Sequence, residues 1–103
     1  MTEREEKIAA ILRQVLSDYN GDACTVNGYG CEGLCLNKES DEWVVATTAH
    51  NHIVSTDARF AKMIDACRFL LDQCFSSCAE AAEAKEYFFT LLRKNVPDFI
   101  KEY

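Results

Sequence analysis

The sequence has little of what would place it among disordered, secreted or membrane proteins. One proline and four glycines occur in 103 residues, and 49% of the residues are hydrophobic, which argues against a disordered chain. No stretch approaches the roughly 18 apolar residues of a membrane-spanning helix. The first residues, MTEREEKIAA, are charged where a secretory signal peptide needs an apolar run. We therefore expect a folded cytoplasmic protein that does not bind a membrane.

Basic residues are nearly missing from the middle of the chain. Residues 18–57 contain Lys38 as their single lysine or arginine, whereas acids and bases balance on either side, so this stretch carries the whole net charge of −6. A surface of this sign repels nucleic acid phosphates and anionic lipids, and it attracts a basic protein. Its seven acids are Asp18, Asp22, Glu32, Glu39, Asp41, Glu42 and Asp57.

The length fits one domain over residues 1–103 that has a single core. Thr2 and Glu5 form the pattern of a capping box, and apolar residues then recur at helical spacing, which predicts a helix over about residues 3–19. After Gly21 the period changes to short β-branched and aromatic runs between turn formers. These runs predict three or four antiparallel strands, within residues 24–26, 34–36, 43–48 and 53–55.

Helical spacing of apolar residues returns at Asp57 and predicts a second helix that breaks near Ser77. Ser77 and Glu80 form another capping-box pattern, which predicts a third helix over about 79–93, and a short terminal helix follows over 97–103. The predicted fold is α+β: an N-terminal helix, a small antiparallel sheet, then two to three C-terminal helices packed on one sheet face. The apolar stripe of the second helix consists of Phe60, Ile64, Cys67, Leu71, Cys74 and Cys78.

Six cysteines form two triplets with identical spacing. On a helix the second triplet would share the apolar face, where cysteine packs as a small apolar residue. Neither triplet contains the C-x2-C or C-x4-C pairs typical of structural zinc sites. In a reducing cytosol we therefore expect free thiols, with no metal and no cofactor. The alternative is a zinc-binding or redox-responsive thiol domain that uses the triplets, which are Cys24, Cys31 and Cys35, and Cys67, Cys74 and Cys78.

No combination of residues in the sequence indicates a catalytic site. His50 and His52 flank Asn51, a favourable turn residue, so we interpret them as a polar hairpin tip. A cysteine nucleophile paired with either histidine would need an orienting group and an oxyanion site, which spacing alone does not supply. We expect the protein not to be an enzyme.

The most suggestive cluster lies in a predicted hairpin loop, where Glu39, Asp41 and Glu42 precede Trp43, the only tryptophan. An aromatic residue rimmed by charges is typical of the centre of a protein interface. Trp43 would serve equally well as a core residue, and its neighbours do not decide between the two roles. The predicted binding surface consists of this loop and of two further acids from the same stretch, Glu32 and Asp22.

These features favour a small acidic protein that inhibits a basic macromolecular partner, such as a nuclease or a nucleic-acid-handling complex. A compact negative domain can occupy a phosphate-binding site as a nucleic-acid mimic, without itself binding nucleic acid. Immunity proteins, antitoxins and phage-encoded inhibitors of bacterial defence, including anti-CRISPR proteins, would suit this role. A second alternative is a small regulatory subunit that acts through an apolar helical face. The sequence sets no expectation for the oligomeric state.

Overall fold

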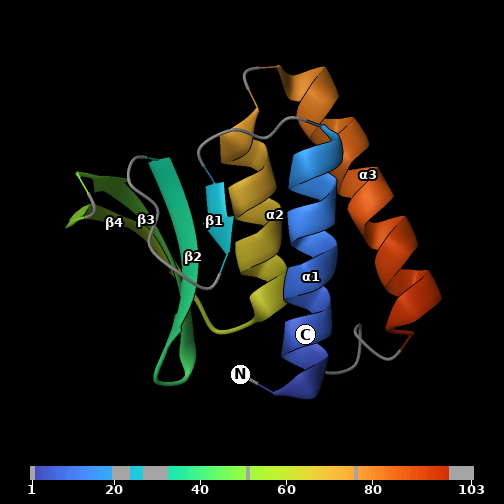
Figure 1. Ribbon diagram of the computed structural model, residues 1–103, viewed down its shortest axis with the longest axis horizontal. Helices are drawn as coiled ribbons and strands as arrows, with labels where there is room; N and C mark the ends of the chain where they lie inside the picture. The colour runs from blue at the N-terminus through green and yellow to red at the C-terminus, as the bar shows by residue number, and fades with distance from the viewer. Residues whose placement is uncertain (1, 20–23, 27–32, 51, 76, 98–103) are drawn as a thin grey trace.

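The computed structural model describes residues 2–19, 24–26, 33–50, 52–75 and 77–97. The elements in these ranges form an α+β fold, which confirms the predicted class and the order helix, sheet, helices (Figure 1). The predicted terminal helix over 97–103 lies almost wholly outside them. The elements are α1 (Glu3–Asp18), β1 (Cys24–Val26), β2 (Gly33–Glu39), β3 (Glu42–Ala49), β4 (His52–Phe60), α2 (Met63–Cys74) and α3 (Cys78–Asn95).

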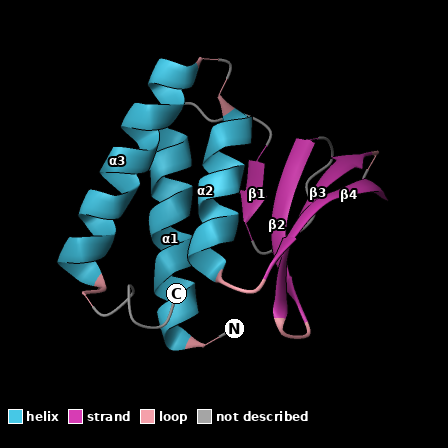
Figure 2. Cartoon of the chain, turned by 180° about the vertical axis from the view of Figure 1, so that it is seen from behind, coloured by secondary structure: helices cyan, strands magenta, loops and turns pink. Residues whose placement is uncertain are grey.

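The elements lie in three layers, with the sheet on one side, α1 and α2 in the middle and α3 outside (Figures 1 and 2). α1 packs on β1, and α2 packs across β2, β3 and β4. α3 packs on α1 and α2, where the Lys85 ammonium lies 2.7 Å from the Asp72 carboxylate of α2. The prediction that the helices cover one sheet face is therefore met directly by α1 and α2, while α3 covers those two helices.

The strands follow the order β1-β2-β3-β4, and β2–β3 and β3–β4 are antiparallel hairpins. β1 pairs in parallel with β2, which corrects the prediction of a purely antiparallel sheet. In the sequence, Asn27-Gly28 is a pair typical of hairpin turns, and a hairpin would return the chain alongside β1 at once. The observed register instead places Val26 beside Leu36, where both side chains are buried in the core.

The boundary between the sheet and α2 also differs from the prediction. Residues 57–60 belong to β4, and the helix begins at Met63 rather than Asp57. Phe60 pairs across the sheet with Trp43, and its ring centroid lies 5.5 Å from that of Phe69 in α2. The spacing of apolar residues would also allow a helix over residues 57–60. The contacts of Phe60 with Trp43 and Phe69 hold these residues in β4 instead.

One continuous core fills the space between the sheet and the helices. The capping box predicted for α1 is present, because Thr2 and Glu5 exchange backbone and side-chain hydrogen bonds. Most apolar positions predicted for the three helices face inward, but Cys78 is exposed, which corrects its place in the predicted stripe. The partly buried ones are Tyr19, Phe60, Cys74, Tyr87 and Leu91. The largest side chains below 2% exposure are Phe88, Ile8, Leu12, Leu36, Met63, Leu70, Leu71 and Leu92.

Cys67 is completely buried on the inner face of α2, whereas Cys78 is exposed at the start of α3. A serine at position 67 would place a hydroxyl in an apolar environment. We expect Cys67→Ser to lower the free energy of unfolding by about 1–3 kcal/mol, measured by urea denaturation under reducing conditions. Cys78→Ser is the matched control and should change it by less than about 0.5 kcal/mol. Equal losses for both variants would contradict this assignment of Cys67 to the core.

Candidate functional site

The predicted acidic loop is the two-residue turn between β2 and β3. Glu39 pairs directly with Glu42, and Ser40 and Asp41 make the turn. Ser40 has a φ of 55°, in the left-handed region that favours glycine. A residue with a side chain is held there at a cost of about 1 kcal/mol, so the neighbouring contacts must fix the turn in place.

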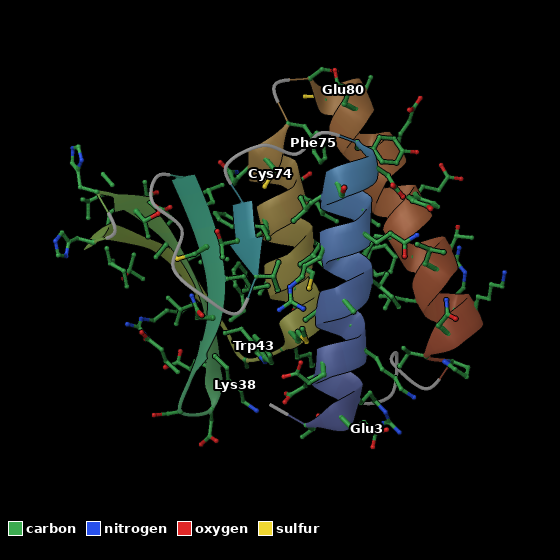
Figure 3. The ribbon with its side chains drawn as sticks, viewed as in Figure 1. Glu3, Lys38, Trp43, Cys74, Phe75 and Glu80 are labelled. Carbon is green, nitrogen blue, oxygen red and sulfur yellow. The ribbon has the colours of Figure 1, made fainter. Side chains whose placement is uncertain are left out.

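Those contacts lie next to the turn, where Lys38 pairs with Trp43. The Trp43 side chain is 3% exposed and belongs to the core. The Lys38 ammonium lies 5.5 Å from the centre of its ring and 3.1 Å from a carboxylate oxygen of Glu5, in the first turn of α1. Figure 3 shows Lys38 and Trp43 side by side near the turn end of the hairpin, close to the start of α1. The acidic turn is therefore anchored to both the core and a helix.

Glu5 takes part in two contacts at once, since its carboxylate accepts the Thr2 backbone N–H at 2.8 Å and hydrogen bonds from Lys38. Burial by itself raises the pKa of this carboxyl. The hydrogen bond from the Thr2 backbone and the ammonium of Lys38 act in the opposite direction and together outweigh burial, so the pKa of Glu5 lies below its ordinary value. Glu5 is thus a charged group whose ionised form stabilises the fold.

The three acids of the turn differ in their surroundings. Glu39 lies 3.3 Å from the Arg59 guanidinium of β4, and both side chains are more than 40% exposed. Asp41 and Glu42 are exposed and form no ion pair with any residue that the structure describes. Because Glu42 stands opposite Glu39, two like charges also face each other across the strands. The uncompensated negative charge of the turn is centred on Asp41 and Glu42.

The structure thus brings together three of the six predicted site residues, Glu39, Asp41 and Glu42. It places Trp43 in the core, the second of the two roles that the sequence left open, so the turn has no exposed aromatic anchor. Asp22 and Glu32 lie outside the described residues.

Sequence reasoning missed the residues that hold the turn. The capping-box pattern identified Glu5 as a residue of the first helical turn. No local pattern indicates its contact with Lys38, which is 33 positions away. Arg59 was counted in a neutral flank of the chain, and folding brings it against Glu39. Its guanidinium reduces the charge that the sequence assigned to this loop.

The cysteines give little support to a metal site. Cys67 and Cys35 are buried, and burial raises the pKa of both thiols, which makes them poor ligands and nucleophiles. The predicted face of three thiols does not form, because α2 ends at Cys74 and Cys78 begins α3. Among the described residues, no group of three or more histidine, cysteine, aspartate and glutamate side chains is placed to hold a metal ion. The side chain of Cys24 and all of Cys31 lie outside that part.

Cys74 corrects the expectation that all six cysteines are free thiols. It is disulfide-bonded. Figure 3 shows its side chain near the C-terminal end of α2. Cys35, Cys67 and Cys78 are free. The sequence argument relied on a reducing compartment, which spacing cannot establish.

No family model, no curated protein and no solved structure matches this chain. In the part of the chain that the structure describes, the helices are too short or too polar for a membrane span. The case for a function therefore depends on the chain's own residues.

The Glu5 contact predicts a specific pH dependence. Because the pKa of Glu5 is lowered on folding, its stabilising effect is present above the ordinary value of about 4.3 and is lost as the pH falls through the folded-state pKa. We expect Glu5→Gln to lower the free energy of unfolding at pH 7 by about 1–2 kcal/mol. The difference from the wild type should shrink below about pH 4.3, measured by denaturation between pH 7 and pH 2.5. Glu86→Gln on the exposed side of α3 is the control, and a loss independent of pH would contradict the assignment.

The disulfide predicts a thiol count. Protein purified without reductant and denatured should show four free thiols per chain, and six after reduction. Cys74→Ser should raise the unreduced count to five by freeing the partner, whereas Cys78→Ser should lower it to three. Six thiols in the unreduced wild type would mean that the disulfide does not form in solution.

Proposed function

We propose that this protein is a small cytoplasmic binding protein that inhibits a basic macromolecular partner through the acidic β2–β3 turn. The partner would be a nuclease or another nucleic-acid-handling complex, whose phosphate-binding site the carboxylates of Asp41 and Glu42 enter in place of phosphates. Immunity proteins, antitoxins and anti-CRISPR proteins are the classes that this proposal favours. In such a cytoplasmic setting the Cys74 disulfide would be reduced.

The observation that carries the proposal is a pair of exposed, uncompensated carboxylates on a rigid support. The turn is held by the buried Trp43 and by the Lys38–Glu5 ion pair, so its acids lose little conformational freedom on binding. Exposed charges of this kind raise the association rate with an oppositely charged surface. One turn presents the carboxylates of both Asp41 and Glu42, so the proposed function needs one copy of the turn.

The two alternative functions have weaker support. A regulatory subunit that acts through an apolar helical face would need such a face on the outside, yet the buried residues of α3, Ala81, Ala84, Phe88 and Leu92, pack inside this chain. Within the described range, the exposed positions of α3 are polar residues, alanines and Cys78, while Tyr87, Phe89 and Leu91 are partly buried against the core. A thiol domain would need several cysteines that converge. Of the described ones, Cys74 is bonded to another cysteine, whereas Cys35 and Cys67 are buried free thiols and Cys78 lies beyond the break between α2 and α3.

Charge reversal tests the proposal. Immobilised wild-type protein should retain a partner from the source cell at low salt and release it at high salt, and the purified partner should lose nucleic-acid binding or cleavage when this protein is added. We expect the double variant Asp41→Lys, Glu42→Lys to slow association several-fold and to weaken its salt dependence, measured by surface plasmon resonance. Glu39 is left unchanged, because it already pairs with Arg59.

The same substitution should leave the fold intact, which separates a binding defect from unfolding. A lysine at position 42 would face Glu39, replacing a repulsive pair with an attractive one worth about 0.2–1 kcal/mol. The variant should therefore be as stable as the wild type or slightly more stable. Glu83→Lys, Glu86→Lys on α3 is the matched control and should bind normally. If the control variant loses the partner and the turn variant keeps it, the acidic turn is not the binding site.

A further inference from the structure

The C-terminal end of α1 carries an acid where a helix favours a base. Asp18 is the last residue of α1, and the last turn of this helix contains no basic residue. The backbone carbonyl groups at this end of a helix carry partial negative charge, which a cation stabilises. Asp18 is exposed and forms no ion pair with any residue in the ranges that the structure describes. This end of α1 therefore attracts a cation that the described part of the chain does not supply.

Two tyrosine rings lie beside the Asp18 carboxylate. The Tyr87 hydroxyl of α3 donates a hydrogen bond to Oδ2 of Asp18, with 3.2 Å between the two oxygens. The Tyr87 ring lies 5.7 Å, centre to centre, from the ring of Tyr19, the C-cap residue of α1, and the two planes are tilted by 51°. The face of a tyrosine ring carries partial negative charge. Two ring faces, a carboxylate and a helix end of the same sign thus meet where α1 lies beside α3 (Figures 1 and 2).

Both tyrosines keep part of their surface exposed. Each packs against the core on one side and is only partly buried. Partial burial and the hydrogen bond to Asp18 raise the pKa of Tyr87, so its hydroxyl remains a neutral donor near pH 7. At a separation of 5.7 Å the two rings contact each other. A ligand therefore reaches the exposed surface of the pair rather than the space between the rings.

We infer that Asp18, Tyr19 and Tyr87 bind an arginine side chain of a partner protein. The guanidinium lies over a tyrosine ring, within about 6 Å of its centre, and donates hydrogen bonds to Oδ1 of Asp18. The Tyr87 hydroxyl donates to Oδ2, and no residue in the described ranges donates to Oδ1. The positive charge also stabilises the negative end of α1.

Arginine suits this site better than lysine does. The guanidinium is planar and carries five N–H donors, so it can stack on an aromatic ring and hydrogen-bond to a carboxylate at the same time. The lysine ammonium is a compact charge that is more strongly hydrated, so it loses more hydration when it approaches a ring. An arginine also forms stronger, charge-assisted hydrogen bonds with a carboxylate than a neutral donor does.

The site is separate from the acidic turn. Asp18 ends a 16-residue helix, so it lies about 20 Å along α1 from Glu5, to which the β2–β3 hairpin is anchored. Exposed charges this far apart are largely screened from each other at physiological salt. The inference therefore does not rest on the proposed inhibition of a basic partner, and the two sites can be tested independently.

An NMR titration with a small probe tests the site. The probe is a peptide of one arginine between two glycines, with both ends blocked, so that the guanidinium is its only charge. We expect saturable shifts of the backbone amide signals of Asp18, Tyr19 and Tyr87 at millimolar peptide concentration, because one exposed contact of this kind is weak. The same peptide with citrulline has nearly the shape of the arginine peptide without its charge and should give no saturable shifts. A lysine peptide should bind more weakly than the arginine peptide.

Three results of this titration would overturn the inference. The first is the absence of saturable shifts with the arginine peptide. The second is a citrulline or lysine peptide that binds as tightly as the arginine peptide. The third is a set of shifts centred on Asp41 and Glu42, which would mean that the peptide binds the acidic turn instead.

Substitutions separate the roles of the charge and the ring. Asp18→Asn removes the charge and Tyr87→Leu removes the ring face, so each should weaken binding of the arginine peptide several-fold. Tyr87→Phe is the matched control: it keeps the ring and frees the carboxylate from the hydroxyl, so it should bind at least as tightly as the wild type. Circular dichroism should show all these variants folded. If Tyr87→Phe loses binding as fully as Tyr87→Leu, the ring face does not hold the peptide and the inference is wrong.

A variant of the acidic turn distinguishes this site from the proposed inhibitory surface. The double variant Asp41→Lys, Glu42→Lys leaves Asp18 and both tyrosines unchanged, and it should bind the arginine peptide as the wild type does. Loss of peptide binding in this variant would overturn the assignment to Asp18. Its slower association with a basic partner is a separate measurement and does not affect this result.

Discussion

The contact of Lys38 with Glu5 and Trp43 is the point on which the arrangement of the sheet end depends. Lys38 lies on β2, Glu5 on α1 and Trp43 on β3, so one ammonium joins the first helix to both strands of the acidic hairpin. Its aliphatic stem covers an aromatic ring while its charge neutralises a buried carboxylate. Without it, a buried carboxylate would remain beside the core, and the hairpin would keep only its apolar attachment. The stability of α1 and the placement of the candidate site are therefore linked through one side chain.

The helices were largely predictable, because their signals are local. The capping boxes beginning at Thr2 and Ser77 mark α1 and α3 to within about two residues. The strands were harder: a turn pair such as Asn27-Gly28 cannot tell whether the next strand returns alongside or pairs in parallel. Residues 57–60 fit the apolar spacing of a helix, yet Phe60 belongs to β4, where it pairs with Trp43 and its ring contacts Phe69. Such a choice is made by tertiary contacts, which local spacing does not contain.

The candidate site was predictable only where its residues are neighbours in the sequence. One turn contains Glu39, Asp41 and Glu42. Residues this close in sequence lie near one another in space even if the strand boundaries are predicted wrongly. The role of Trp43 was not predictable because β3 is buried on both faces from Trp43 to Ala46, and the alternation that identifies an inward face is lost. The ion pair of Glu39 with Arg59, which is 20 positions away in the sequence, depends on the pairing of both β2 and β4 with β3.

The β2–β3 and β3–β4 hairpins expose different kinds of side chains. The β2–β3 turn presents charge and no exposed apolar side chain, while residues 52–56 of β4 include the exposed Ile53 and Val54 and contain no acid, lysine or arginine. Charged groups close to apolar side chains would lose hydration if that surface were covered. The carboxylates of Asp41 and Glu42 avoid this cost because they lie at the opposite end of β3 from Ile53 and Val54. Asp57 is the acid that lies next to those apolar residues, and its carboxylate is held by hydrogen bonds from Thr47 and Ser55.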